Sequence, residues 1–312
     1  MTGQAVVVKN AGSHFLLSCM PGWNPFPAVL RGKVRLGAGT STNPVAVGDI
    51  VDWQAEVPAD PLHPAVITAV HPRSNCVIRK STNLSRQSHV IAANLSRAFL
   101  VTTLYFPEVK LPFLDRMLVT CEVYKIPVTI VLNKMDMYGN EVPEEVERFR
   151  SIYEGAGYEV LGTSVKTGEG IGRLKELVRE GVCLLSGESG VGKSSLVKCI
   201  DPSLEPKIGR ISDAHLQGRH TTSLYEMYPV SGGGYVIDTP GLRGFGLVDL
   251  EKEEIAKYFP EMLSLADSCR FVPCTHTHEP GCAVKAAVED GRISPERYNS
   301  YLGMLEEDGK FR

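Results

Sequence analysis

The first residues with recognisable chemistry form a glycine-rich segment at residues 182–196, VCLLSGESGVGKSSL. Gly187 is followed by four residues and then by Gly192-Lys193-Ser194, which is the G-x-x-x-x-G-K-S spacing of a phosphate-binding loop. A strand-like apolar run, Val182–Leu185, precedes the loop, and a helix is predicted over Lys193–Ile200. Glycines let backbone N–H groups point at phosphate oxygens, and the helix N-terminus adds positive potential. The segment therefore predicts a nucleotide phosphate site.

Each residue type in this loop has a separate task. Lys193 reaches the outer phosphates as a point charge, and Ser194 offers its hydroxyl to the Mg²⁺ that accompanies a nucleotide. The predicted phosphate contacts are Gly187, Glu188, Ser189, Gly190, Val191, Gly192, Lys193, Ser194 and Ser195. The alternative is a chance glycine-rich turn, which the strand, the full spacing and the helix together disfavour.

A second motif selects the base. Asn133-Lys134-Met135-Asp136 follows a buried strand predicted at Pro127–Leu132. The Asp136 carboxylate can accept hydrogen bonds from both N1–H and the N2 amino group of guanine, a donor pair that adenine lacks. Asn133 and Lys134 would brace the loop and cover the ring. Thr163-Ser164-Val165-Lys166 is similar to the S-A-K loop that lies behind the base, although valine replaces its alanine. We predict GTP and GDP as ligands.

The segment after the phosphate loop, Asp201–Thr222, is polar and irregular, as a nucleotide-sensing switch would be. Thr221 or Thr222 is expected to meet Mg²⁺ and the terminal phosphate, and the sequence leaves open which of them does. A hairpin then ends in Asp238-Thr239-Pro240-Gly241. In this D-x-x-G pattern Asp238 would lie at the metal through water, and the N–H of Gly241 would sense the terminal phosphate.

The residue after this pattern bears on hydrolysis. Leu242 stands where many GTPases have a glutamine that orients the attacking water, so slow intrinsic turnover is predicted. His220, beside the switch threonines, is the candidate catalytic residue. The alternative is that His220 only contacts a partner or packs locally.

Four residues near the C-terminus have the spacing of a metal site. Cys269, Cys274, His276 and Cys282 fall within fourteen positions, and three thiolates with one imidazole fit tetrahedral zinc. Such a set leaves no open position, so we predict one structural zinc ion. His278 is the competing ligand. The alternative is a group of free buried cysteines with two surface histidines, and the other five cysteines lie singly along the chain.

The elements that must position these residues divide the chain into three predicted domains. Residues 1–82 contain short apolar stretches broken by Gly, Pro and Asn, which predicts a small OB-type β-barrel. Seven basic and four acidic side chains in residues 1–80 would suit a nucleic-acid binder, and a packing or adaptor module is the alternative. Residues 81–97 are polar and are interpreted as a linker that enters the next domain near Ile91.

Residues 83–249 alternate strand and helix, which predicts a doubly wound α/β domain. The base-recognition motif here precedes the phosphate loop, the reverse of the usual GTPase order, so we interpret the domain as circularly permuted. Residues 250–312 are predicted to form a mostly helical zinc-binding domain, with helices expected at Glu251–Phe259, Pro260–Asp267, Ala283–Asp290 and Pro295–Glu307.

Composition limits the remaining possibilities. The 312 residues carry a net charge of −3, so any nucleic-acid contact must come from a local patch. The sequence contains no apolar run of transmembrane length, and its start lacks the long apolar region of a signal peptide. We expect a cytoplasmic protein without membrane contact. A monomer is the default expectation.

With these motifs, the chain resembles the bacterial circularly permuted GTPases of small-ribosomal-subunit biogenesis, the RsgA type. The resemblance rests on the barrel, the permuted motifs and the C-x4-C-x-H-x5-C element, and it covers nearly the whole chain. It implies GTP hydrolysis stimulated by the small ribosomal subunit, contact of the barrel and zinc domain with ribosomal RNA, and a role in late subunit maturation. Two other classes stay open: an RNA-binding assembly factor for which GTP is only a conformational ligand, and a P-loop ATPase or kinase, against which the N-K-M-D motif argues.

Overall fold

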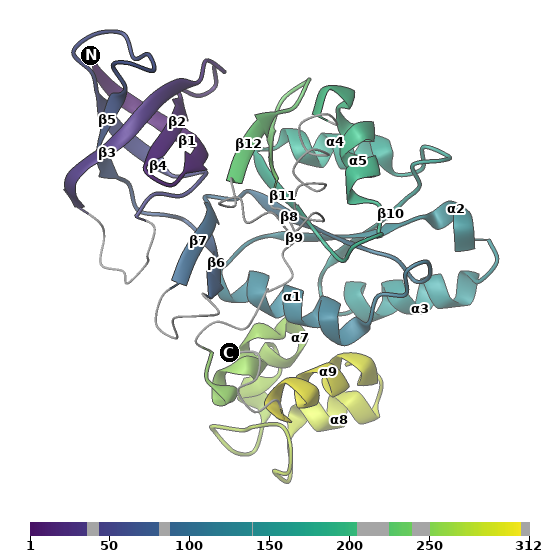
Figure 1. Ribbon diagram of the computed structural model, residues 1–312. Coiled ribbons are helices and arrows are strands. Elements are labelled where there is room, and N and C mark those ends of the chain that lie inside the picture. Colours follow the sequence, from purple (N-terminus) through teal and green to yellow (C-terminus); the bar gives the residue numbers. More distant parts are fainter. Residues whose placement is uncertain (36–43, 81–87, 139, 205–224, 239–249, 307–312) are drawn as a thin grey trace. The chain divides into compact units, whose positions relative to one another are not determined.

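The computed structural model describes residues 1–35, 44–80, 88–138, 140–204, 225–238 and 250–306 (Figure 1). The chain forms two compact units, each assembled from segments that are distant in sequence. The first contains Met1–Ala98, Arg173–Ser186 and Ser194–Gly244, and the second contains Phe99–Gly172, Gly187–Lys193 and Phe245–Arg312.

A closed five-stranded barrel occupies the N-terminal part of the first unit. Its strands are β1 (Thr2–Ala11), β2 (His14–Ser18), β3 (Phe26–Arg35), β4 (Ile50–Gln54) and β5 (Ala65–Val70). They pair in the order β1-β2-β3-β5-β4, and β4 closes back on β1; only the β3–β5 pairing among these is parallel. Alternate residues such as Val7, Leu17 and Ile67 fill the interior and are fully buried. This closure fits the predicted OB-type barrel.

The aromatic residues of the barrel pack with one another. The rings of Phe26 and Trp53 lie 4.9 Å apart between centroids, and both rest on the barrel core. Both rings therefore contribute to the packing of the barrel core.

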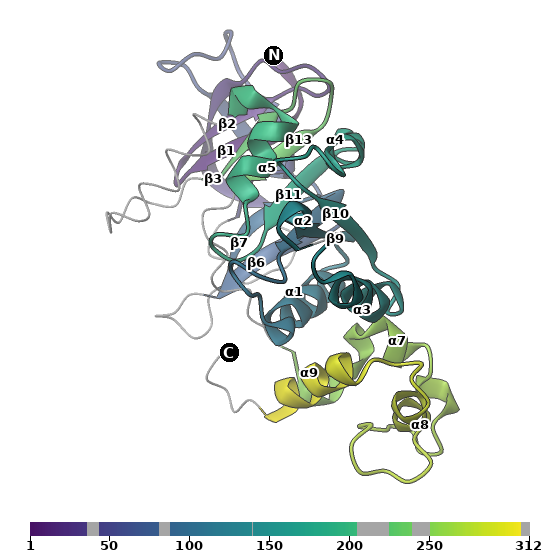
Figure 2. The same ribbon diagram turned by 90° about the vertical axis from the view of Figure 1, so that its right-hand side faces the viewer.

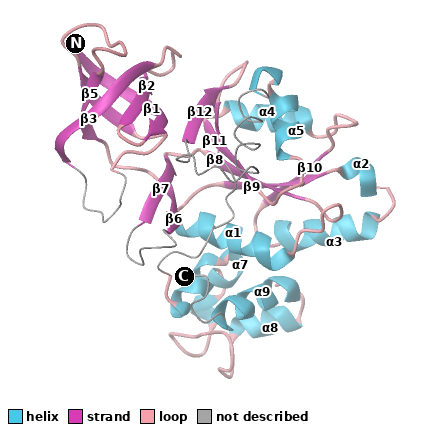
Figure 3. Cartoon of the chain, viewed as in Figure 1, coloured by secondary structure: helices cyan, strands magenta, loops and turns pink. Residues whose placement is uncertain are grey.

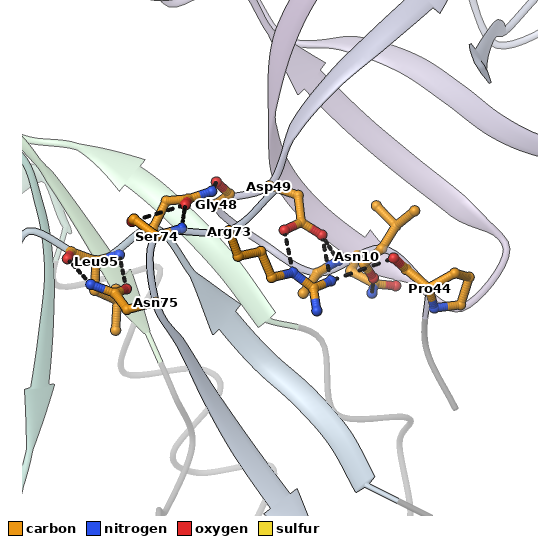
Figure 4. Close-up of polar contacts among 11 residues, drawn as sticks. Asn10, Pro44, Gly48, Asp49, Arg73, Ser74, Asn75 and Leu95 are labelled. Carbon is orange, nitrogen blue, oxygen red and sulfur yellow. Dashed lines mark hydrogen bonds and ion pairs between the residues drawn. The ribbon is translucent and has the colours of Figure 1, made fainter. Parts of the chain in front are cut away.

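A buried ion pair joins the barrel to the residues that follow it (Figure 4). The Arg73 guanidinium donates to both carboxylate oxygens of Asp49, at 2.7 and 2.8 Å, and the Asp49 side chain is fully buried. The hydrogen bonds to Asp49 raise the pKa of Arg73 despite its burial. Asn75 and Leu95 add a reciprocal pair of side-chain to backbone hydrogen bonds, both 2.8 Å. The ion pair therefore fastens Arg73 to the barrel, and the Asn75–Leu95 hydrogen bonds hold these two residues of the following segment together.

The interpretation of residues 81–97 as a linker was wrong for their second half. Strand β6 (Cys76–Lys80) pairs in antiparallel fashion with β7 (Ser88–Ala93). The run Val90–Ala93 is buried throughout, with exposed fractions of 0–2 %. Four apolar residues after a polar stretch are too short a pattern to predict a strand. The strand is recognisable in the structure because its backbone pairs with that of β6.

The rest of the first unit carries part of the α/β domain. Its elements are α4 (Ile171–Arg179), β11 (Val182–Ser186), α5 (Lys193–Ile200), η1 (Pro202–Leu204), β12 (Tyr225–Pro229) and β13 (Tyr235–Asp238). Strands β11 and β13 are parallel, and β12 pairs in antiparallel fashion with both β13 and β1. An ion pair of 2.8 Å between Lys9 and Glu226 spans the β1–β12 pairing. Within this unit the barrel and the α/β strands therefore share one continuous sheet.

The second unit begins with three more strands of the α/β domain. They are β8 (Arg97–Thr102), β9 (Val128–Asn133) and β10 (Glu159–Thr163), in the order β10-β9-β8, with α1 (Leu111–Val123), α2 (Met135–Tyr138) and α3 (Pro143–Glu154) between them. Helices α1 and α3 lie on one face of these strands (Figure 3). Strands β9 and β10 are parallel and place Thr163 opposite Asn133, so the loops after both strands leave from the same edge.

The C-terminal residues form short helices that pack beneath α1 (Figure 2). They are η2 (Lys252–Tyr258), α7 (Pro260–Leu263), η3 (Ala266–Ser268), α8 (Ala283–Glu289) and α9 (Pro295–Glu306). The helix predicted over Glu251–Phe259 is a 3₁₀-helix at Lys252–Tyr258, and Pro260 holds Phe259 in an extended conformation that separates it from α7. Among the described residues, no helix is long and apolar enough to cross a membrane.

A buried arginine connects the C-terminal helices to α1. Arg297 on α9 donates to Asp115 of α1 at 2.8 Å and, through two nitrogens, to Glu261 of α7 at 2.8 and 3.2 Å. The Arg297 and Asp115 side chains are each 1 % exposed. Burial opposes the charge of Arg297, but the two carboxylates outweigh it and raise its pKa. The guanidinium carbon also lies 4.5 Å from the ring centroid of Phe259.

Candidate nucleotide and metal sites

The predicted phosphate loop has the expected strand–loop–helix setting. It connects β11 to α5, and Gly187, Gly190 and Gly192 all have positive φ angles. A Cβ on Gly192 would collide with the Asn133 side chain, and one on Gly187 would collide with the carbonyl of Val101. These two positions therefore require glycine for close approach as well as for backbone conformation.

The loop lysine holds the loop in shape. The Lys193 ammonium donates to the backbone carbonyls of Gly187 and Glu188, at 2.8 and 2.5 Å. Ser194 and Ser195 follow it on the first turn of α5 with exposed side chains. A hydroxyl at the exposed start of a helix suits the oxygen-ligand chemistry of Mg²⁺.

Asn133 links the base-recognition motif to the phosphate loop. This side chain is 2 % exposed and donates to the carbonyl of Val191 at 2.8 Å. Its oxygen accepts a hydrogen bond of 2.9 Å from the hydroxyl of Thr163 at the end of β10. Its backbone carbonyl accepts from the hydroxyl of Tyr138. One amide side chain thus connects three loops that lie far apart in sequence.

Asp136 lies exposed at the start of α2 with one oxygen already occupied. The hydroxyl of Ser164 donates to Asp136 Oδ1 at 2.6 Å, and the same hydroxyl accepts from the N–H of Thr167 at 3.1 Å. The loop after β10 therefore orients the carboxylate. This hydrogen bond brings the S-A-K-like loop into direct contact with the N-K-M-D motif. Thr163 and Tyr138, which brace Asn133, were not predicted as site residues; a threonine directly before the Ser164 loop was the available signal.

Some predicted site residues cannot be placed. His220, Thr221, Thr222 and Gly241 lie outside the described residues. Asp238 is the last residue of β13, and the D-x-x-G pattern requires its aspartate at the end of a strand.

The four predicted metal ligands converge in the second unit. The ligand atoms of Cys269, Cys274, His276 and Cys282 all lie within 4.8 Å of one another. Cys269 Sγ lies 4.0 Å from Cys282 Sγ, and His276 Nδ1 lies 3.6 and 3.4 Å from these two sulfurs. The competing ligand, His278, is exposed and bonds to the hydroxyl of Thr277 instead.

The spacing of these atoms fits a tetrahedral metal ion. Ordinary zinc–ligand lengths put two sulfurs about 3.8 Å apart and a sulfur and nitrogen about 3.6 Å apart. Burial raises the pKa of Cys274 to about 12. Burial also lowers the pKa of His276, which favours the neutral imidazole that a metal binds. Buried thiols of this kind ionise readily only beside a cation, so the donor set is compatible with zinc.

Polar contacts hold the metal-ligand loop in this geometry. Glu279 accepts from the N–H and hydroxyl of Thr275, at 2.8 and 2.6 Å, which lowers the pKa of Glu279 to about 2 against the effect of burial. The hydroxyls of Tyr298 and Tyr301 donate to the carbonyls of His276 and Thr275, at 2.7 and 2.5 Å. Both tyrosines belong to α9, so the helix that carries Arg297 also holds the metal-ligand loop in place.

The fold and the two sites define a class of protein. A phosphate loop after a strand, joined by Asn133 to an N-K-x-D loop, is the site of a P-loop GTPase, and here the motifs follow one another in a permuted order. A TM-score of 0.73 relates the chain to the crystal structure of YloQ, described as a circularly permuted GTPase, at 25% identity over 98% of this chain and 94% of the other.

The family follows from closer relatives. The RsgA GTPase family profile matches residues 70–248. The small ribosomal subunit biogenesis GTPase RsgA of Bacteroides fragilis is 44% identical over 311 residues, 99% of each chain. The crystal structure of YjeQ from Thermotoga maritima is similar with a TM-score of 0.78 and 32% identity over 98% of both chains. The chain belongs to the RsgA GTPase family.

Proposed function

We propose that this protein hydrolyses GTP as an assembly factor of the small ribosomal subunit, and that hydrolysis is coupled to late maturation and to its own release. The full-length identity with a small ribosomal subunit biogenesis GTPase supports the assembly role. The observation that carries the nucleotide chemistry is Asn133, which joins the guanine-recognition loop to the phosphate loop by a buried hydrogen bond.

We assign the site residues as follows. The phosphate contacts are Gly187, Glu188, Ser189, Gly190, Val191, Gly192, Lys193, Ser194 and Ser195, and the base contacts are Asn133, Lys134, Met135, Asp136 and Ser164. Ser194 would hold Mg²⁺, which neutralises phosphate charge when bound. Asp238, Gly241 and one of Thr221 and Thr222 would sense the terminal phosphate, and His220 would position the attacking water; these roles are supported by sequence alone.

The three predicted regions keep separate tasks in this proposal. The barrel (1–82) and the helical zinc-binding region (250–312) would contact ribosomal RNA, and the permuted GTPase region (83–249) would bind GTP and GDP. The β6–β7 hairpin spans the first boundary and would couple the barrel to the GTPase region. We place the protein in the cytoplasm, where ribosomal subunits assemble, and take a monomer as its working state.

Turnover of GTP by the full chain, with and without purified small ribosomal subunits, tests the proposal. We expect slow turnover alone and a large increase with subunits, and we expect no increase with ATP, because adenine lacks the donor pair that Asp136 accepts. Tight GDP binding without any subunit-dependent increase would instead favour a binding factor for which GTP is only a conformational ligand. Equal turnover of ATP would contradict guanine recognition.

We further propose that Cys269, Cys274, His276 and Cys282 hold one structural zinc ion. Protein purified without chelator is expected to contain about one zinc per chain, and Cys282→Ser is expected to lose it, because a hydroxyl is a poor zinc ligand. Elemental analysis by mass spectrometry measures both. His278→Ala is the matched control and should keep the ion. A zinc-free wild type, or loss of zinc from His278→Ala but not from His276→Ala, would contradict the assignment.

A further inference from the structure

An exposed aromatic residue lies in the loop between β8 and α1. Phe106 is 72% exposed, although the loop around it is firmly held. The hydroxyl of Thr103 donates to the carbonyl of Pro107 at 2.6 Å, and the ring of Tyr105 packs on that of Tyr138 with 6.1 Å between centroids. The Tyr105 hydroxyl donates to Glu145. Single exposed apolar residues are common, so exposure alone assigns nothing to Phe106.

The contacts of this loop with the nucleotide site set Phe106 apart. The Lys134 ammonium, from the base-recognition motif, donates to the backbone carbonyl of Phe106. On the other side, a Cβ on Gly190 of the phosphate loop would lie 3.4 Å from Cδ of Pro107. Residues 106–107 therefore bridge the loop that recognises the base and the loop that recognises the phosphates. The nucleoside must lie between those two ends.

The backbone is also constrained at Phe106 and Lys134, the two residues that this hydrogen bond joins. Phe106 and Lys134 have φ angles of 54° and 68°, in the left-handed region that non-glycine residues rarely adopt. Such conformations persist where surrounding contacts enforce them, and they cluster at ligand sites. The conformation of Phe106 is thus tied to that of the base-recognition loop.

We propose that the Phe106 ring packs against the nucleoside of bound GTP and GDP, beside the stem of Lys134. An aromatic face adds affinity without selecting a base, so Phe106 would contribute binding strength while Asp136 contributes specificity. The inference rests on the proposed nucleotide site. It adds an aromatic face to the base and phosphate contacts assigned above.

Calorimetric titration of the full-length protein with GDP and with GTP tests this role. Phe106→Ala is expected to weaken both nucleotides by about tenfold and by the same factor, because the nucleoside is common to both. Phe106→Tyr and Phe106→Trp should keep wild-type affinity, since each retains a ring. Leu62→Ala, which truncates another exposed apolar side chain in the barrel region, is the matched control and should change nothing.

The outcomes separate this inference from the proposed site. If Phe106→Ala binds GDP like the wild type while Lys193→Ala abolishes binding, the stacking role is wrong and the nucleotide site stands. If Lys193→Ala also binds like the wild type, both assignments fall. Loss of affinity in Phe106→Tyr and Phe106→Trp equal to that in Phe106→Ala would show that the loop conformation matters and the ring does not, which would also overturn the proposal.

Discussion

Asp136→Asn is expected to weaken GTP binding by about a thousandfold and to make xanthosine triphosphate the preferred nucleotide. The carboxylate accepts from two N–H groups of guanine, whereas an asparagine amide presents one acceptor and one donor. The amide NH₂ would face the N2 amino group of guanine, donor against donor. Xanthine carries a carbonyl oxygen at that position, and the same NH₂ can donate to it.

The surroundings of Asp136 allow the substitution by asparagine without disturbing the fold. Ser164 donates to Asp136 Oδ1, and the oxygen of an asparagine can keep that hydrogen bond while its nitrogen faces the base. The side chain is exposed, so the substitution buries no unpaired group. The fold should therefore remain intact while recognition changes.

Competition binding of GTP, xanthosine triphosphate and ATP to wild type and variant measures the change. Asp267→Asn removes the same charge from an exposed site in the C-terminal region and is the matched control. Wild-type GTP affinity in Asp136→Asn would show that this carboxylate does not meet the base. Loss of all three nucleotides would indicate that the charge shapes the loop rather than reads guanine.

The nucleotide motifs could be predicted because their chemistry is local. Glycines at Gly187 and Gly192, with Lys193 directly after, are required at fixed spacing, and the structure gives each glycine a specific close neighbour. The sequence favours His276 over His278 as the ligand, but spacing alone leaves His278 in competition. Both spacings suit a zinc ligand, and only the fold buries one ring beside the thiols and exposes the other.

Other features depend on partners that no local pattern contains. Strand β7 is recognisable only beside β6, and the contact of Phe106 with Lys134 joins residues that are 28 positions apart. Arg297 meets Asp115 across 182 positions. A charged residue within a helical pattern ordinarily predicts a solvent-facing side chain, so the local pattern does not indicate that Arg297 lies in a core.

The second large effect is expected on stability, from removal of the buried Arg297. Arg297→Ala is expected to lower the free energy of unfolding of the C-terminal helices by about 3–5 kcal/mol, because the buried carboxylates of Asp115 and Glu261 both lose the guanidinium that pairs with them. Burial already raises the pKa of Asp115 despite the opposing charge of Arg297. Without the guanidinium, Asp115 and Glu261 would have to take up protons or admit water.

The measurement must report on α1 and α9 themselves. The two tryptophans, Trp23 and Trp53, belong to the barrel region, so their fluorescence follows a different part of the chain. Hydrogen exchange detected by mass spectrometry resolves the amides of both helices, and their protection should fall together in Arg297→Ala. Arg292→Ala, which removes an exposed arginine paired with Asp290, is the matched control and should leave protection unchanged.

The two variants distinguish a structural connection from a mere surface contact. If protection falls in α9 alone, Arg297 stabilises its own helix and does not join it to α1. If neither helix changes, the buried ion pair contributes nothing net, as some buried pairs do when their desolvation cost matches their attraction. If both fall, the metal-ligand loop should loosen with them, since α9 supplies Tyr298 and Tyr301 to that loop, and zinc should be lost more readily to a chelator.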